Sequence, residues 1–311
     1  MRVFGDYLDL YRDRILVHDA RDDGSLVEIG TTSRGTSVHI NHHILDVDRI
    51  ICMGNVKPHY FAGFAGGRKS ILPGVAGYRT IEQNHSHACD PFALPMNLEG
   101  NPVAEDMEEG ARLLGDKPIF SIQTVLDQDH RLARCFSGDL KASFREAVIL
   151  ARTLFGVPVA SRSSIVITAN PYPMDINLYQ SQHALENVRG IVEPGGIIIL
   201  VSRCWGGVGN SAYLNALDTM REEENSGHTD YRLGDHKAVR FRQMVEHADL
   251  WMVSDLDDTT VQRSMMRPFR SIQKAVDQAV KVVEERGMIP RIRIFPMGGM
   301  TVPIMDKTLT M

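Results

Sequence analysis

The chain has 311 residues, with 34 lysines and arginines against 39 aspartates and glutamates, and a formal net charge of −5. At about 150 residues per domain this length indicates two compact domains, and the acidic balance excludes a general attraction to nucleic acid or anionic lipid. Hydrophobic residues make up 43 % and charged residues 23 % of the chain, a composition that excludes a disordered or fibrous protein.

The sequence contains no candidate membrane span or signal peptide. The longest aliphatic run, residues 197–201, is far shorter than the roughly 20 apolar residues that cross a bilayer. Charged residues interrupt the first twenty positions, where a signal peptide needs an apolar core. The cysteines lack any C-x-x-C pair, which favours free thiols in a reducing compartment. We therefore expect a cytoplasmic protein with small-molecule partners and neither a membrane nor a nucleic-acid partner.

The first half of the chain predicts two buried strands with a glycine-rich stretch between them. Apolar runs at 48–53 and 118–125 are typical of such strands. Residues 60–77 are rich in glycine, which suits either backbone wrapped closely around a ligand or a merely flexible loop. Asn101-Pro102 predicts the start of a helix, and apolar spacing predicts another helix over 140–155.

The second half alternates strands and helices, which predicts a parallel sheet. The expected strands are 164–168, 197–202, 250–253 and 291–295, and the expected helices are 176–189, 211–224, 235–247 and 271–286, with a turn at 194–196.

The predicted fold class is α/β, with two α/β domains, mainly parallel sheets and a cofactor cleft between the domains. Helix-stopping residues place a domain boundary near residue 157. We expect a cofactor-binding N-terminal domain over 1–157 and a C-terminal α/β domain over 158–291, with 292–311 returning to the first domain.

The side chains that could carry chemistry are concentrated between residues 59 and 87. This stretch combines histidines with an amine, at His59, Lys69, His85 and His87. Each of these residues alone is weak evidence, because a lone histidine or lysine is more often a surface group.

The residues alone leave two interpretations of this stretch open. Residues 63–70 nearly fit the phosphate-binding loop G-x-x-x-x-G-K-[ST], but Arg68 stands where the second glycine is required. The second interpretation is a zinc site formed by imidazole, thiolate and carboxylate side chains that lie close together in the sequence, although no further ligand pair lies nearby. These side chains belong to His85, His87, Cys89 and Asp90.

The same stretch resembles a known family signature. It reads Pro-His-x-Phe-Ala-Gly-Phe-x-Gly-Gly-x-Lys-x-x-x-Pro-Gly over 58–74, followed by Asn-His-Ser over 84–86. This pattern is similar to that of the nickel-dependent lactate racemases and their relatives. Residues 19–22, 30–36, 175–180 and 194–196 resemble the same family, so the resemblance covers essentially the whole chain.

The resemblance implies a nickel pincer nucleotide, a pyridinium mononucleotide that binds nickel through one carbon and two sulfurs. Lys69 would hold it through a thioamide, in a loop where Gly66 and Gly67 bind the cofactor, and His85 would ligate the nickel. His59 would be the general acid/base in racemisation or epimerisation of a small, lactate-like 2-hydroxy acid by reversible hydride transfer. The enzymes that synthesise the cofactor would be partners.

The chain also departs from the family pattern. Relatives carry an upstream Gly-Thr-His-Arg-like motif whose histidine is a second acid/base, and no such motif precedes Asp19. We therefore expect a chain that lacks the family's N-terminal segment. Tyr179 and Gln180 match substrate-binding residues, whereas His183 stands where relatives carry a lysine for the substrate carboxylate. A non-catalytic, nickel- or nucleotide-binding remnant of the family is the alternative to an enzyme.

Overall fold

The C-terminal sheet is built from parallel strands. In this computed structural model, which describes residues 4–209, 214–215, 217–218 and 233–306, five strands run in the order β12-β11-β10-β9-β13. They are β9 (Ser163–Ala169), β10 (Val192–Val201), β11 (Asp249–Val253), β12 (Arg267–Phe269) and β13 (Ile292–Phe295).

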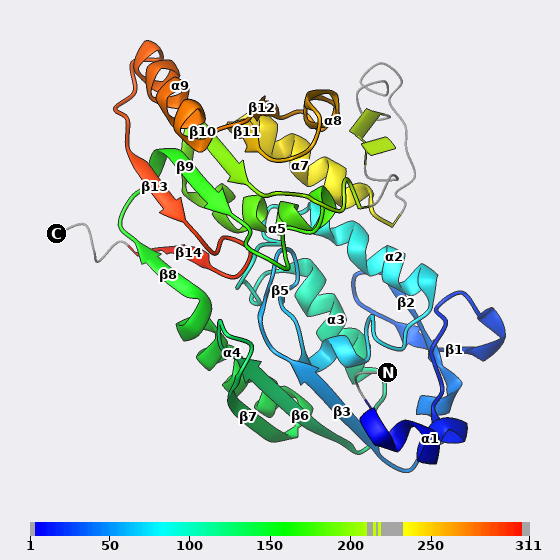
Figure 1. The fold of residues 1–311 in the computed structure, drawn as a ribbon. Coiled ribbons are helices and arrows are strands. Elements are labelled where there is room, and N and C mark those ends of the chain that lie inside the picture. The colour runs from blue at the N-terminus through cyan, green and yellow to red at the C-terminus, as the bar shows by residue number, and fades with distance from the viewer. Residues whose placement is uncertain (1–3, 210–213, 216, 219–232, 307–311) are drawn as a thin grey trace.

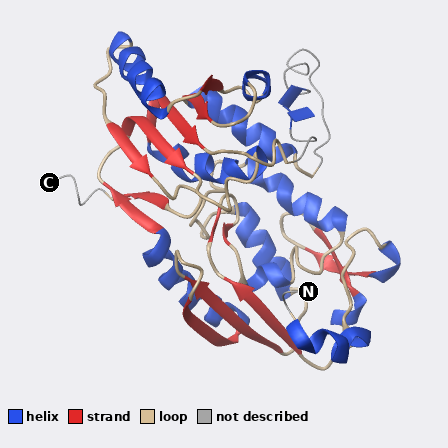
Figure 2. Ribbon diagram, viewed as in Figure 1, coloured by secondary structure: helices blue, strands red, loops and turns tan. Residues whose placement is uncertain are grey.

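Helices cover both faces of this sheet, as Figure 2 shows. The helices of this lobe that the structure describes in full are α5 (Leu178–Val188), α7 (Asp235–His247), α8 (Asp258–Arg263) and α9 (Ile272–Glu285). Val166 and Ile198 pack in the cluster with α5 and α7, whereas Ile165 and Ile199 pack in the cluster with α9. Burial on both faces explains why the central strands β9 and β10 contain continuous apolar runs, whereas the edge strands β12 and β13 carry arginines and are partly exposed.

The N-terminal lobe combines a mixed sheet with two antiparallel pairs (Figure 1). In the order β3-β6-β7, β6 pairs in parallel with β3 and antiparallel with β7. The strands are β3 (Ile50–Asn55), β6 (Ile119–Leu126) and β7 (Leu132–Asp139), with the pairs β1 (Leu26–Thr31) with β2 (Ser37–Asn41) and β4 (Pro58–His59) with β5 (Gly63–Phe64). The helices are α1 (Leu8–Tyr11), α2 (Tyr78–Ser86), α3 (Pro102–Arg112) and α4 (Leu140–Phe155).

The chain returns to the first lobe after it completes the C-terminal sheet. β14 (Val302–Met305) pairs in parallel with β8 (Gly156–Val159), beside it in Figure 1, and Val302 is buried in a cluster with Phe144 of α4. β13, in contrast, pairs with β9. The expected return of 292–311 is thus corrected, because 292–295 belong to the C-terminal sheet.

Most expected elements agree with the structure. Asn101 caps α3 by accepting hydrogen bonds from two backbone N–H groups, and the helix predicted over 140–155 is α4. The turn expected at 194–196 is instead an irregularity within β10, where Gly195 has a φ of +74°. The helix expected over 211–224 falls mostly outside the described residues. Within the part of the chain that is described, every helix is too short or too polar to cross a bilayer.

Candidate active site

The glycine-rich stretch packs on the protein's own core. Gly66 and Gly67 have φ angles of +84° and +56°, in the region that favours glycine. A Cβ on Gly67 would lie 2.5 Å from the Phe144 ring, and one on Gly66 would lie 2.7 Å from Cγ2 of Val56. The two glycines therefore allow the short 3-10 turn Gly67–Ser70 to pack tightly against the core, and this turn fixes the backbone that carries Lys69.

A pocket of about 580 Å³ lies between the two lobes. Its wall contains the predicted residues His59 and His85 from the N-terminal lobe, and Tyr179 and His183 from α5. The structure thus brings together side chains that are more than 90 positions apart in the sequence. Gln180, also predicted as a substrate contact, lies outside the residues that line the pocket.

Lys69 lies behind the pocket wall. Its Nζ is 5.8 Å from the centroid of the Phe61 ring, and Phe61 lines the pocket. Burial, followed by the charge of Arg68, lowers the pKa of Lys69 to about 7. A large share of this amine is therefore uncharged at neutral pH, which is the nucleophilic form of a lysine.

His59 is held as a neutral imidazole. Burial lowers its pKa well below the ordinary value, and the charges of Lys69 and His183 lower it further. Its Nδ1 accepts a hydrogen bond of 3.3 Å from the backbone N–H of Ala62. A nitrogen that accepts this bond carries no proton, so the hydrogen bond assigns the proton of the neutral ring to Nε2.

His85, on α2, is a second neutral imidazole. Burial, then the charges of Lys69 and His236, lower its pKa to about 3. Its Nδ1 is buried and has no hydrogen-bond partner among the described residues. A buried nitrogen without a partner calls for an explanation, and an uncharged imidazole nitrogen with a free lone pair is a common metal ligand.

The sequence did not point to two pocket residues on α7, His236 and Lys237. Nε2 of His236 is hydrogen-bonded to the Tyr60 hydroxyl at 3.2 Å, and its ring centroid lies 5.9 Å from that of His85. Nζ of Lys237 lies 3.0 Å from the centroid of the Tyr179 ring. The helix predicted over 235–247 could have indicated them, because His236 and Lys237 lie four and three residues before Arg240 and so share a helix face with it.

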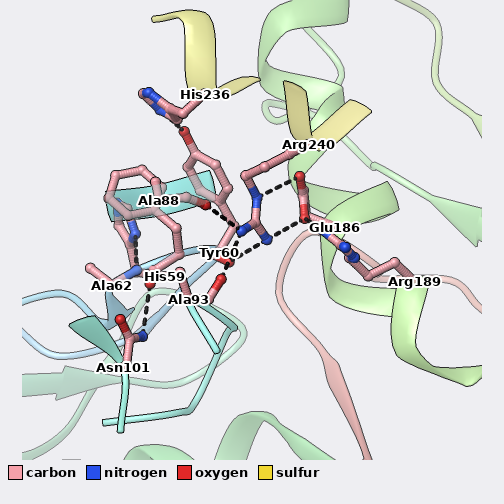
Figure 3. A network of polar contacts seen from close by, with 11 residues as sticks. His59, Tyr60, Ala62, Ala88, Ala93, Asn101, Glu186, Arg189, His236 and Arg240 are labelled. Atoms are coloured by element: carbon pink, nitrogen blue, oxygen red, sulfur yellow. Dashed lines mark hydrogen bonds and ion pairs between the residues drawn. The ribbon is translucent and has the colours of Figure 1, made fainter. Parts of the chain in front are cut away.

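Arg240 joins α7 to both α5 and the N-terminal lobe (Figure 3). Its Nε and Nη2 donate to the two carboxylate oxygens of Glu186 at 3.0 and 2.7 Å. Its Nη1 donates to the carbonyl oxygens of Ala88 and Ala93 at 2.9 and 2.8 Å, and Nη2 also donates to that of Tyr60 at 3.3 Å. This buried clamp fixes α7 beside the backbone that carries His59.

The two alternatives left open by the sequence do not fit the structure. A phosphate-binding loop leads into an α-helix at its lysine, whereas here a 3-10 turn ends at Ser70 and α2 begins only at Tyr78. Among the described residues, the cluster with metal-ligand spacing is His42, His43 and Asp46. The zinc group proposed from sequence, His85, His87, Cys89 and Asp90, therefore does not converge.

The fold and pocket define a two-lobed α/β protein with neutral imidazoles in the pocket between its lobes and a buried amine behind the pocket wall. The family models for the lactate racemase N-terminal and C-terminal domains match residues 2–93 and 159–302. A lactate racemase of Lactiplantibacillus plantarum is 31 % identical over 296 residues, which cover 92 % of this chain and 69 % of that protein. The chain belongs to the lactate racemase family and is an enzyme of the racemase and epimerase class.

Other relatives agree with this assignment. The lactate racemase of Thermoanaerobacterium thermosaccharolyticum is 28 % identical over 315 residues, covering 98 % of this chain and 72 % of that protein. Its apoprotein structure superposes with a TM-score of 0.85 at 28 % identity, over 93 % of this chain and 70 % of that one. A Thermotoga maritima structure, at 12 % identity and a TM-score of 0.64 over 93 % and 77 % of the two chains, shares the fold. The predicted family and the predicted α/β class are confirmed.

Proposed function

We propose that the protein racemises or epimerises a small 2-hydroxy acid such as lactate, using a nickel pincer nucleotide attached to Lys69. The observation that carries this proposal is a pair of neutral imidazoles, His59 and His85, in the wall of one pocket between the lobes, with the buried amine of Lys69 behind the pocket residue Phe61. When bound, the cofactor would supply a hydride acceptor beside the substrate, with Lys69 and His85 as the residues that would hold it.

The residues present fit this cofactor. The lowered pKa of Lys69, about 7, suits an amine that becomes covalently attached, because a strongly charged lysine is a poor nucleophile. His85 is a neutral imidazole whose buried Nδ1 makes no hydrogen bond among the described residues, and one ring nitrogen of a neutral imidazole has a lone pair available to nickel. Gly66 and Gly67 would contribute by permitting the turn that positions Lys69.

His59 would exchange the proton of the substrate hydroxyl. A general acid/base must reach the oxygen and be uncharged before it accepts a proton, and His59 lines the pocket as a neutral ring. With the proton assigned to Nε2, this nitrogen can donate to the oxygen of the planar keto acid. Accepting the hydroxyl proton at Nε2 requires loss of the long hydrogen bond from Ala62.

Tyr179 and His183 would contact the substrate from α5, because both line the pocket. Burial, followed by the charge of Lys237 and against the charge of Glu186, lowers the pKa of His183 to about 4. His183 would therefore act near neutral pH as an uncharged hydrogen-bonding group. Gln180, outside the wall, would act through its neighbours.

We place this activity in the cytoplasm, together with the cofactor-synthesising enzymes. Within the described residues, Cys52, Cys89, Cys135 and Cys204 are all free thiols, which suits a reducing compartment.

Co-expression with the cofactor-synthesising enzymes and nickel tests the proposal. Intact-mass analysis is expected to show an adduct that Lys69→Ala abolishes and the exposed Lys274→Ala retains. Chiral chromatography then measures interconversion of D- and L-lactate and of other 2-hydroxy acids. An adduct without turnover of any 2-hydroxy acid would support a non-catalytic binding protein, and absence of an adduct in the parent protein would refute the proposal.

A further inference from the structure

Lys237 is a buried lysine in the wall of the pocket. Only 7 % of the residue is exposed, and its Nζ lies over the Tyr179 ring at 3.0 Å from the centroid and 5.6 Å from that of Tyr60. Within the described chain its ammonium makes no hydrogen bond or ion pair. An ammonium removed from water without an anionic partner is costly, so a lysine at this place in the wall suits a pocket that receives an anion.

The nearest carboxylate on α5 is already engaged. Both oxygens of Glu186 accept hydrogen bonds from Arg240, at 3.0 and 2.7 Å, and Arg189 approaches one of them at 3.4 Å. Glu186 raises the pKa of Lys237 without pairing with it, and burial, the larger effect, brings that pKa down to about 7. A carboxylate entering the pocket would stabilise the charged form of Lys237.

The other basic groups of the wall are less suited to this role. His183 and His236, which face Lys237 from α5 and α7, have pKa values lowered by burial to about 4 and about 3, so both are uncharged near pH 7. Asp235, from the same helix turn, adds a negative charge. Arg21 is exposed at the wall and its guanidinium stacks on the Tyr78 ring at 3.6 Å.

We propose that Lys237, on α7, binds the carboxylate of the 2-hydroxy acid, and that His183, on α5, contributes a neutral hydrogen bond beside it. This inference rests on the proposed function. It assigns the charge that binds the carboxylate to Lys237 on α7, whereas the family pattern placed the carboxylate contact at His183 on α5.

Binding measurements on matched variants test this assignment. Lys237→Met keeps the length of the side chain and removes its charge, and Lys237→Arg keeps the charge. Isothermal titration of the cofactor-free protein compares lactate with lactamide, its uncharged amide, and the KM of the cofactor-loaded enzyme is the second readout. We expect Lys237→Met to weaken lactate binding by about 10- to 100-fold, the range for a hydrogen bond to a charged group.

The controls separate this charge from a general effect on the pocket. Lys237→Met is expected to leave lactamide binding unchanged, Lys237→Arg to keep the preference for lactate, and His183→Gln to weaken lactate and lactamide alike. The Lys69 adduct and the thermal midpoint report whether each variant is folded. If Lys237→Met does not fold, the parent protein still decides: equal affinity for lactate and lactamide would overturn the inference.

The two proposals fail in different ways. A parent protein that binds and turns over a 2-hydroxy acid, with Lys237→Met folded and lactate affinity unchanged, refutes the role of Lys237 alone. A parent protein that neither binds nor turns over any 2-hydroxy acid refutes the proposed function and, with it, the substrate on which the role of Lys237 depends.

Discussion

Replacing Arg240 by methionine should destabilise the protein strongly, because it leaves a buried carboxylate without its main partner. Arg240 is 1 % exposed and Glu186 is 5 % exposed. The substitution removes two hydrogen bonds to the carboxylate and the donors to the carbonyl oxygens of Ala88 and Ala93. Breaking a buried ion pair from one side costs about 3–5 kcal/mol, and we expect a loss in that range.

Urea unfolding monitored by tryptophan fluorescence measures this loss, and the same helix provides a control. Arg242 pairs with Glu246 at 3.0 Å on the surface of α7, where the side chains are 38 % and 61 % exposed. Arg242→Met should therefore change the free energy of unfolding by about 0.5 kcal/mol or less. Combining Arg240→Met with Glu186→Gln removes the stranded charge and should recover about half of the loss.

The pH dependence gives the sharper test. In the parent protein Arg240 keeps the pKa of Glu186 below its ordinary value although burial would raise it. In Arg240→Met burial is opposed only by Arg189, so the folded pKa should rise above the unfolded value of about 4.3. The folded variant then binds this proton more tightly than the unfolded chain, and its stability deficit should shrink as the pH falls from 8 to 5. If Arg240→Met lowers the free energy of unfolding by less than about 1 kcal/mol, and this loss does not change with pH, the buried clamp is refuted.

Three further outcomes are expected. In the cofactor-loaded protein, metal analysis should show greater nickel loss in His85→Ala than in His87→Ala, because only His85 lines the pocket; equal loss would contradict a single ligand. Gly67→Ala should destabilise more in urea than Gly115→Ala, since both have positive φ but a Cβ has open space only at Gly115; equal losses of about 1–2 kcal/mol would mean that strain alone decides. Lactate affinity of the loaded enzyme should fall as the pH rises through the Lys237 pKa of about 7, because the charged form exists below it; a KM that is flat from pH 6 to 9 would contradict this.

Elements with strong local patterns could be predicted from the sequence. The bounds of α4 follow from apolar spacing that ends at Phe155, before Gly156, and the central strands of the C-terminal sheet are continuous apolar runs. β7 was not predicted because most of its residues are exposed and lack a regular alternation. α2 was missed because its N-cap residue is Gly77, which has no side chain to cap the helix and so leaves no start signal in the sequence.

The same difference between local and long-range signals applies to the site. His59, Lys69 and His85 lie within one stretch of sequence, so a motif could find them together. The contact of Tyr60 with His236 joins residues 176 positions apart, and only the folded arrangement of the lobes brings α7 to the loop. The sequence also indicated that Gly67 is special, but it could not reveal that the close neighbour is Phe144.

The division of the site between the lobes has a mechanistic consequence. The groups proposed to hold the cofactor, Lys69 and His85, belong to the N-terminal lobe, whereas Lys237 is on α7 of the C-terminal lobe. Arg240, one turn after Lys237, donates to the Tyr60 carbonyl and so ties this helix to the backbone next to His59. Loosening that clamp should therefore weaken substrate binding before it affects cofactor attachment. In Arg240→Met, an increased KM for lactate with a retained Lys69 adduct is expected, and loss of the adduct with an unchanged KM in the remaining loaded enzyme would contradict this division.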